Sequence, residues 1–145
     1  MKPACVLDAS VVVKWWFKDE QVALATAAQT FLAAYSANTL DIFAPDLLLA
    51  EVGNVLWKAT RLRNWPQVAA RQAIADLSNL GISTYPTVNL LPNALALAVL
   101  HGITVYDALY IALAQQLKLP LYTADLRLVR ALDGSISEIQ ELSPV

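Results

Sequence analysis

Short apolar runs alternate with longer segments of helical periodicity along this chain of 145 residues. A short apolar run closed by a turn residue is typical of a buried strand, and apolar residues recurring every three or four positions are typical of a helix. These patterns predict strands at 4–7, 42–45, 82–87, 121–123 and 135–140. They predict helices at 10–17, 21–36, 46–63, 65–80, 92–101, 104–117 and 125–132.

Capping residues support several of these boundaries. Ser10 and Asp46 are the expected N-caps of their helices. Pro66 suits the first turn of a helix, and Gly81 and Gly102 stand where helices should end. Short strands that alternate with helices favour a short parallel sheet covered by helices on both faces, which is a three-layer α/β/α fold.

The composition indicates a single domain spanning 1–145. Hydrophobic residues make up 57% of the chain and charged residues 15%, which excludes a disordered protein and suggests an apolar face covered by self-association. No uncharged apolar run is long enough to span a membrane, and Asp8 interrupts the N-terminal run, so we expect a cytoplasmic protein without a membrane segment. The lone cysteine, Cys5, excludes a disulfide framework and is expected to be a buried strand thiol.

The net charge of −2 excludes binding of a polyanion through bulk charge, so any contact with nucleic acid must be local or metal-mediated. Six basic residues are candidate phosphate contacts, although each also suits an ordinary surface. They are Lys14, Lys58, Arg61, Arg63, Arg127 and Arg130.

Trp15 and Trp16 are adjacent and point about 100° apart on a helix, so we expect one of them in the core. The other, with Phe17, is either packed or free to contact a partner. Trp57 and Trp65 are expected to be packed.

Two acidic residues follow predicted strands. Asp8 comes directly after the first strand, and Asp125 stands two positions after Thr123, the last residue of the strand LYT. In parallel α/β folds, ligands bind outside the carboxyl ends of the strands. We therefore expect both carboxylates at one edge of the sheet.

Two further acidic residues lie on apolar sides of helices. Glu51 interrupts the run LLLAEVGNVLW, whose expected apolar stripe is Leu48, Val52, Val55, Ala59 and Leu62. On a helical wheel Glu51 lies about 60° from Leu48, which places it on the buried side. Asp107 opens another helix, and its neighbours three and four positions later are Tyr110 and Ile111.

A divalent cation would explain why carboxylates occupy such places. An unpaired buried carboxylate costs several kcal/mol, and two carboxylates about 5 Å apart at an effective dielectric near 20 repel by about 3 kcal/mol. No basic residue stands at helical spacing beside Glu51 on that face. Oxygen ligands without histidine or cysteine favour Mg²⁺ or Mn²⁺, and the single histidine, His101, suits a helix end or the surface.

Each acid also has an ordinary structural interpretation. Asp107 forms T-x-x-D with Thr104, a capping pattern, and Asp125 suits the N-cap of the helix that follows. Asp8 could cap its own helix, and Glu51 could pair with an arginine. The functional interpretation therefore depends on the four residues together.

Three segments together resemble a known family. VLDASVVVKWW, APDLLLAEVGNVL and TVYDALYIALAQQLKLPLYTADLRL are similar in order and spacing to the PIN domain, most closely the VapC-type toxin ribonucleases of prokaryotic toxin–antitoxin pairs. The resemblance runs from Val6 to about Ala131. It implies a three-layer α/β/α PIN-like fold and a metal-dependent endoribonuclease that hydrolyses RNA phosphodiester bonds.

The resemblance also implies roles for individual residues and partners. The family's acidic residues match Asp8, Glu51, Asp107 and Asp125, which would bind Mg²⁺ or Mn²⁺. Its supporting polar positions match Ser10, Thr123 and Asn54. The implied partners are an RNA substrate, a cognate antitoxin protein and a second copy of the chain in a homodimer.

Other functions remain open at this point. A catalytically silent PIN-like module would bind RNA or a partner without cleaving RNA. An aspartyl phosphatase would want D-x-D after the first strand, where position 10 is serine, and a phospho-accepting receiver domain would want paired acids there and a late lysine. A requirement for metal in RNA cleavage would separate these classes.

Overall fold

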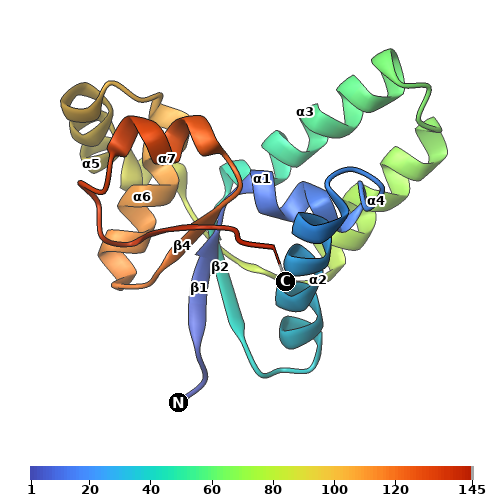
Figure 1. Ribbon diagram of the computed structural model, residues 1–145, viewed down its shortest axis with the longest axis horizontal. Helices are drawn as coiled ribbons and strands as arrows, with labels where there is room; N and C mark the ends of the chain where they lie inside the picture. Colours follow the sequence, from blue (N-terminus) through green and yellow to red (C-terminus); the bar gives the residue numbers. More distant parts are fainter. Residues whose placement is uncertain (145) are drawn as a thin grey trace.

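The computed structural model describes residues 1–144, whose centre is a five-stranded parallel sheet (Figure 1). The strands are β1 (Ala4–Leu7), β2 (Asp41–Pro45), β3 (Ser83–Tyr85), β4 (Leu121–Thr123) and β5 (Ile139–Glu141). They are ordered β3-β2-β1-β4-β5, so the first strand lies in the middle, where Val6 pairs with Phe43 on one side and Leu121 on the other. The carboxyl ends of all five strands therefore point to the same edge.

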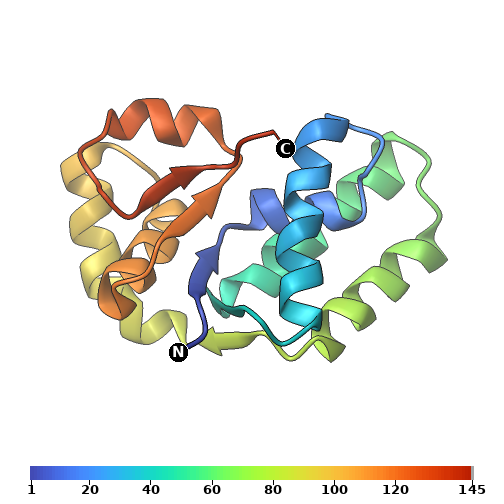
Figure 2. The same cartoon turned by 60° about the horizontal axis from the view of Figure 1, so that its bottom comes forward.

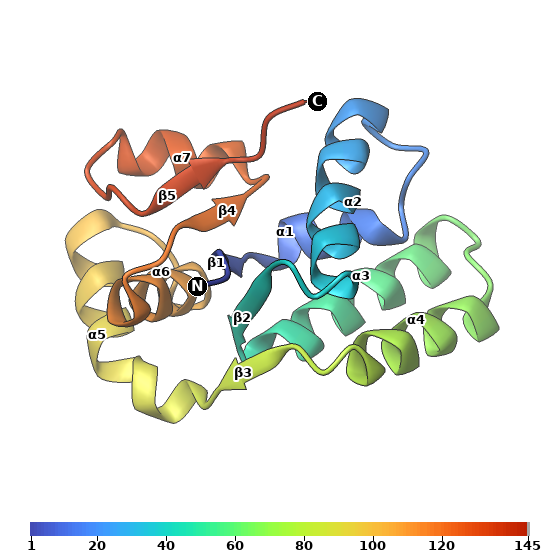
Figure 3. The same cartoon turned by 90° about the horizontal axis from the view of Figure 1, so that it is seen from below.

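Helices cover both faces of this sheet, which confirms the three-layer prediction (Figures 2 and 3). The helices are α1 (Ala9–Val12), the 3₁₀ turn η1 (Val13–Trp15), α2 (Val22–Ser36), α3 (Leu47–Leu62), α4 (Gln67–Asn79), α5 (Thr87–His101), α6 (Val105–Leu117) and α7 (Leu126–Leu132). One face carries α6, packed across β1, β2 and β4, with α5 against it. The other side carries α2, α3 and α4, and α7 packs beside β5.

The centre of the core is formed by β1 and α6. Cys5, Val6 and Leu7 are all buried, as expected for a strand with helices on both faces. Every residue of α6 from Ala108 to Ala114 is buried too, and a helix that is apolar all round belongs inside a molecule. Asp8 and Asp107 extend from these two rigid elements. Burial also raises the pKa of the Cys5 thiol to about 12, consistent with the predicted inert strand thiol.

The N-terminal boundary of α5 differs from the prediction. Helix α5 begins at Thr87 instead of Pro92, and Pro92 lies inside it. The start is fixed by a contact from another part of the chain: Asp46 Oδ1 accepts hydrogen bonds from the backbone N–H of Thr87 at 3.1 Å and from its hydroxyl at 2.6 Å. Asp46 was predicted to cap α3, yet its side chain makes no cap bond there. Strands β3 and β5 are also shorter than predicted.

The tryptophans separate into core and surface. Trp15 is the core member of the adjacent pair, 3% exposed, and its Nε1–H donates to the carbonyl of Ala28 at 2.9 Å. Trp16 is half-buried, and Trp65 packs against Phe17. The prediction for Trp57 was wrong, because that side chain is 54% exposed on α3.

Within residues 1–144, none of the helices is by itself long and apolar enough to cross a membrane. Only α5 and α6 taken together reach the required length and composition, and the two are bent by 116° at their junction.

Candidate active site

The four acidic residues selected from the sequence line one pocket of about 260 Å³ at the carboxyl ends of the strands. Asp8 follows β1, Glu51 lies on α3, Asp107 is in the first turn of α6, and Asp125 precedes α7. In Figure 1 this edge lies at the top, between α3 on one side and α6 and α7 on the other. The rest of the lining is Ala9, Ser10, Val13, Asn54 and Val55.

Asp8 is held at the bottom of the pocket by two hydroxyl groups. The hydroxyls of Ser10 and Thr123 donate to Asp8 Oδ2 at 2.6 and 2.8 Å. The same hydroxyls accept from the backbone, Ser10 from Ala124 N–H at 2.9 Å and Thr123 from Asp125 N–H at 3.1 Å. Ser10 is therefore not the predicted N-cap of α1. It joins the turn after β1 to the turn after β4, and so fixes two acids relative to each other.

The pKa of Asp8 is raised, and the causes compete. Burial, at 7% exposure, raises the pKa most because the charged form loses water, and the charge of Asp125 adds to the effect. The hydrogen bonds from Ser10 and Thr123 lower the pKa, since they favour the carboxylate. The hydroxyls thus limit the cost of ionising a buried acid.

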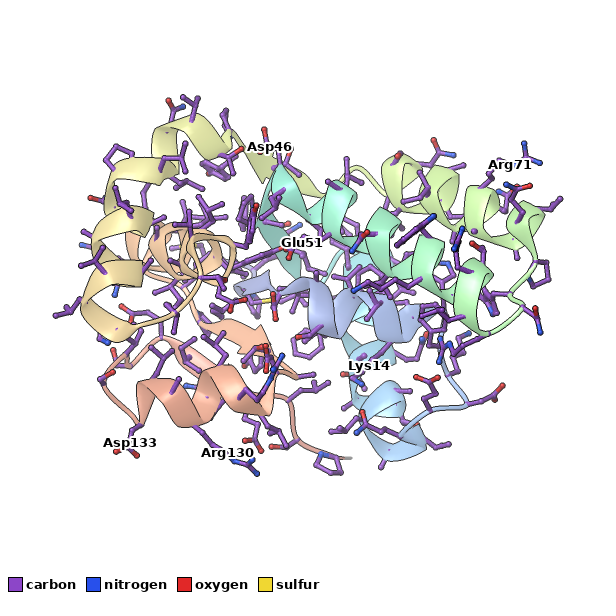
Figure 4. All side chains as sticks on the ribbon, turned by 90° about the horizontal axis from the view of Figure 1, so that it is seen from above. Lys14, Asp46, Glu51, Arg71, Arg130 and Asp133 are labelled. Atoms are coloured by element: carbon purple, nitrogen blue, oxygen red, sulfur yellow. The ribbon has the colours of Figure 1, made fainter. Side chains whose placement is uncertain are left out.

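Glu51 lies on the pocket wall, and the predicted stripe of α3 was partly wrong. The buried residues of this helix are Leu48, Val52, Leu56 and Ala59, whereas Leu62 is 77% exposed. The core-facing side is thus rotated away from Val55, which lines the pocket together with Glu51. In Figure 4, which looks into this edge, Glu51 lies near the centre of the molecule. Glu51 therefore interrupts the apolar run because this side of α3 lines a pocket next to the core.

Tyr110 is the residue of the site that the sequence reasoning missed. Its hydroxyl donates to Glu51 Oε1 at 2.6 Å, and the ring is 1% exposed. Burial raises the pKa of Glu51, the bond from Tyr110 opposes the rise, and the charges of Asp8 and Asp107 add to it. Burial and the neighbouring carboxylate also raise the pKa of Tyr110, so the phenol stays a donor. A buried tyrosine hydroxyl usually needs a hydrogen-bond partner. Tyr110 stands three residues after Asp107 on an apolar helix, so the sequence did contain a signal for such a contact.

Asp107 and Asp125 combine a structural contact with a place in the pocket. The backbone N–H of Asp107 donates to Thr104 Oγ1 at 3.1 Å, which caps α6 as predicted, while the Asp107 side chain lines the pocket. Asp125 Oδ1 accepts from the N–H groups of Arg127 and Leu128 at 3.0 and 3.3 Å, which caps α7. The cap of α6 is thus Thr104 and that of α7 is Asp125, and neither cap removes the Asp107 or Asp125 carboxylate from the pocket.

The pKa of Asp107 is raised as well. Burial is the main cause, and the charges of Asp8 and Asp125 raise it further, whereas Arg127 and the contact with Thr104 lower it. Three carboxyls of one pocket, Asp8, Glu51 and Asp107, thus share a raised pKa, and the charge of at least one other acid of the pocket contributes to each rise.

The donor chemistry of the pocket fits a hard divalent cation. The polar lining offers carboxylate, hydroxyl and amide groups, and no lysine or arginine belongs to it. In the part of the chain that the structure describes, no three acidic, histidine or cysteine side chains come close enough to form a ready metal site. The carboxylates instead line the pocket at some distance from one another, and their negative charges repel. A doubly charged ion is the group that would offset this repulsion.

Comparison with known proteins agrees with this geometry. The family model described as PIN domain matches residues 5–133. The chain is 33% identical to Ribonuclease VapC3 of Pyrobaculum aerophilum over 125 residues, which cover 85% of this chain and 90% of that protein. It is 36% identical to Ribonuclease VapC1 of Mycobacterium tuberculosis over 128 residues, covering 88% and 90%.

A solved structure supports the same assignment. The crystal structure of PAE2754 from Pyrobaculum aerophilum superposes with a TM-score of 0.64 at 25% sequence identity, covering 98% of this chain and 92% of that one. The family match spans most of the chain, and the named relatives cover it almost from end to end. The chain therefore belongs to the PIN domain family, with the VapC ribonucleases among its relatives.

Proposed function

We propose that this chain is a metal-dependent endoribonuclease that hydrolyses RNA phosphodiester bonds and acts as the toxin of a toxin–antitoxin pair. One observation carries the proposal: four carboxylates from four separate segments line one pocket, in a chain related to named VapC ribonucleases. In this proposal Asp8, Glu51, Asp107 and Asp125 are the catalytic residues, and Ser10, Thr123 and Asn54 support them.

The metal would be Mg²⁺ or Mn²⁺. Asp8, Asp107 and Asp125 would hold it, and Glu51 would bind it directly or through a water molecule. When bound, such an ion lowers the pKa of water and offsets negative charge on the phosphate. It would also allow a pocket of four acids to accept a polyanion.

The chain's own residues orient the reaction. Ser10 and Thr123 hold Asp8 in one rotamer through Oδ2, and Tyr110 holds Glu51 through Oε1. Glu51 lines the same pocket, so its carboxylate accepts a proton from the attacking water in this proposal. The water oxygen forms a bond to phosphorus, the bond from phosphorus to the departing ribose oxygen breaks, and that oxygen takes up a proton from solvent. The amide of Asn54, one turn after Glu51, can donate to a phosphate oxygen.

Metal-dependent cleavage tests the proposal. We expect the purified protein to cleave single-stranded RNA with Mn²⁺ or Mg²⁺ and to stop when EDTA is added, as read from labelled fragments on a gel. Asp107→Asn should lose more than about 100-fold in rate, because a ligand and its charge are removed. The control is Asp133→Asn, an exposed residue on α7's C-terminal side that points away from the pocket (Figure 4). RNA that stays intact with the parent chain under every metal would instead favour the silent binding module.

We also propose a homodimer formed through α5. Four apolar residues of this helix are exposed at spacings of three and four, which places them along one face. They are Val88, Leu91, Leu95 and Val99. Sedimentation velocity should find a dimer for the parent and a monomer for Leu95→Lys. Val68→Lys on α4, where the parent residue is also apolar and is more exposed than Leu95, should stay dimeric. Identical sedimentation of all three proteins would contradict this interface.

A further inference from the structure

A second hollow of about 280 Å³ adjoins the pocket of the four acids. The two hollows share Asp107 and Asp125, so these carboxylates form the divide between them. The second hollow lies between the turn that joins α5 to α6 and the side of α7 that carries Arg127, Leu128 and Ala131. Its other lining residues are Gly102, Ile103, Thr104, Arg127, Leu128 and Ala131.

Arg127 is the one basic residue that lines either hollow. Its side chain is exposed, and its charge acts on Asp107. Within residues 1–144, the only ion pairs are those of Lys2 with Asp41 and Arg63 with Glu20, so Arg127 has no carboxylate partner at contact distance. A cation therefore stands beside the acids while remaining available to another anion.

The other candidate phosphate contacts are less suitable. Arg63 pairs with Glu20 and lies over the ring of Phe17, and the half-buried Lys14 donates to Gln21 Oε1 at 2.9 Å. Arg130, one turn further along α7, lines neither hollow and points away from Glu51 in Figure 4. Lys58 and Arg61 on α3 line neither hollow either, and Arg61 lies over the ring of Trp57. The structure thus selects Arg127 from the six basic residues that the sequence left equivalent.

The rest of the second hollow suits a nucleobase. Ile103, Leu128 and Ala131 give it apolar walls, and Thr104 adds a hydroxyl. Gly102, with a φ of +67°, leaves open space where a side chain would stand. A nucleobase is a flat, partly apolar ring, and apolar walls beside a guanidinium can contact both such a base and its phosphate.

We propose that this second hollow binds the nucleotide adjacent to the scissile phosphate, with Arg127 contacting the phosphate of that nucleotide and the apolar walls contacting its base. The proposal rests on the proposed nuclease function, because the scissile phosphate is placed in the pocket of the four acids. The guanidinium of arginine can donate two parallel hydrogen bonds to a phosphate, which gives both affinity and register. Once a divalent ion offsets the charge of Asp107 and Asp125, Arg127 is free to make this contact.

Steady-state cleavage of a single-stranded oligoribonucleotide in Mn²⁺ tests the proposal, with Arg127→Gln compared with Arg130→Gln on the same helix. We expect Arg127→Gln to raise KM about tenfold and to reduce the slope of log(1/KM) against log[salt] by about 0.7, the value for one phosphate contact on a single strand. Arg127→Lys should recover part of the loss, since a point charge remains. Ala131→Phe, which fills the hollow without changing charge, should raise KM and leave the salt slope unchanged.

Different outcomes separate this proposal from the nuclease assignment. If the parent and Arg130→Gln cleave RNA but Arg127→Gln matches them in KM and salt slope, the second hollow is not the nucleotide site and the nuclease stands. A loss confined to kcat, with an unchanged salt slope, would mean that Arg127 acts only through Asp107, and this too would overturn the proposal. If neither the parent nor Arg130→Gln cleaves RNA in any metal, both assignments fail. Thermal unfolding of each variant checks that it is folded.

Discussion

At the scale of single residues, Thr123 links the fold of the protein to its proposed chemistry. The side chain is 0% exposed, and its hydroxyl has two roles at once. It donates to Asp8 Oδ2 at 2.8 Å and accepts from the N–H of Asp125 at 3.1 Å. One buried oxygen therefore sets the rotamer of one acid and the backbone position of another.

Thr123→Val removes this oxygen while keeping the shape of the side chain. We expect a loss of about 1–3 kcal/mol in the free energy of unfolding, because a buried N–H and a buried carboxylate each lose a partner. We expect the cleavage rate to fall about 10–100-fold, as is usual when the group that orients a metal ligand is removed. Urea denaturation and RNA cleavage measure the two effects. Thr26→Val on α2, whose exposed hydroxyl bonds only to the carbonyl of Val22, is the matched control and should change neither.

The position of the acids along the chain was predictable, whereas their support was only partly so. Asp8 and Asp125 follow strands, and that order alone places them at one edge of a parallel sheet. The N-cap interpretation of Ser10, which was wrong, arose because a serine after a strand looks like a cap. The family resemblance had instead implied a supporting role for Ser10, and its hydroxyl does bond to Asp8. The bond of Tyr110 to Glu51 joins residues 59 positions apart, and no local pattern reveals which acceptor a buried phenol will find.

At the scale of elements, the starts of α3 and α5 are connected by side-chain hydrogen bonds. Asp46 precedes α3, but its carboxylate accepts from the N–H and the hydroxyl of Thr87, the first residue of α5. A helix start needs acceptors for its first N–H groups, and here another helix supplies one. Because α5 packs on α6, this contact also steadies the helix that carries Asp107.

Asp46→Ala should therefore destabilise the fold without affecting the chemistry. We expect the free energy of unfolding to fall by about 1 kcal/mol, the usual effect of losing a cap, with an unchanged cleavage rate because Asp46 lines neither hollow. The urea midpoint gives the first value and RNA cleavage the second. Asp76→Ala on α4, which removes only an exposed bond from Gln72, should leave the midpoint within error. Equal urea midpoints for the two variants would contradict a stabilising role for the hydrogen bonds between Asp46 and Thr87.

The elements predicted correctly are those whose signals are local. β1, with its run ACVL, and β4, with LYT, were predicted at their observed bounds, since a short apolar run closed by a polar residue needs nothing distant. The start of α5 was missed because Asp46, 41 residues earlier, decides it. The stripe of α3 was misjudged because a helix beside a pocket carries apolar residues, such as Val55, that do not face the core.

At the scale of the whole molecule, the shared pocket of acids makes stability depend on pH and metal. The pKa values of Asp8, Glu51 and Asp107 are raised on folding, so the native state holds more protons than the unfolded chain between the unfolded and folded values. Their contribution to the free energy of unfolding therefore falls as pH rises from the ordinary pKa values, 3.8 for aspartate and 4.5 for glutamate, through the raised values, and is constant above them.

Thermal unfolding in EDTA should reveal this contribution when the parent is compared with Asp107→Asn. Near pH 3.8 the two proteins should be similar, and at pH 7.5 the variant should be the more stable, because one repelling charge is gone. Mn²⁺ at 100 times its Kd should then stabilise the parent by about 2.7 kcal/mol and the variant much less. A parent that is more stable than the variant in EDTA at pH 7.5, or unaffected by Mn²⁺, would contradict the electrostatic account of the pocket.

The central position of β1 has a consequence for the order of events during translation. Val6, in β1, must wait for Leu121 of β4 to be made before its second neighbour in the sheet exists. At about 5–20 residues per second, that interval lasts on the order of 10 s. Until then Asp125 has not been made, and the nascent chain has an incomplete set of acids. If the four acids act together as proposed, a growing chain of this topology becomes able to cleave RNA only after the segment that carries Asp125 has been made.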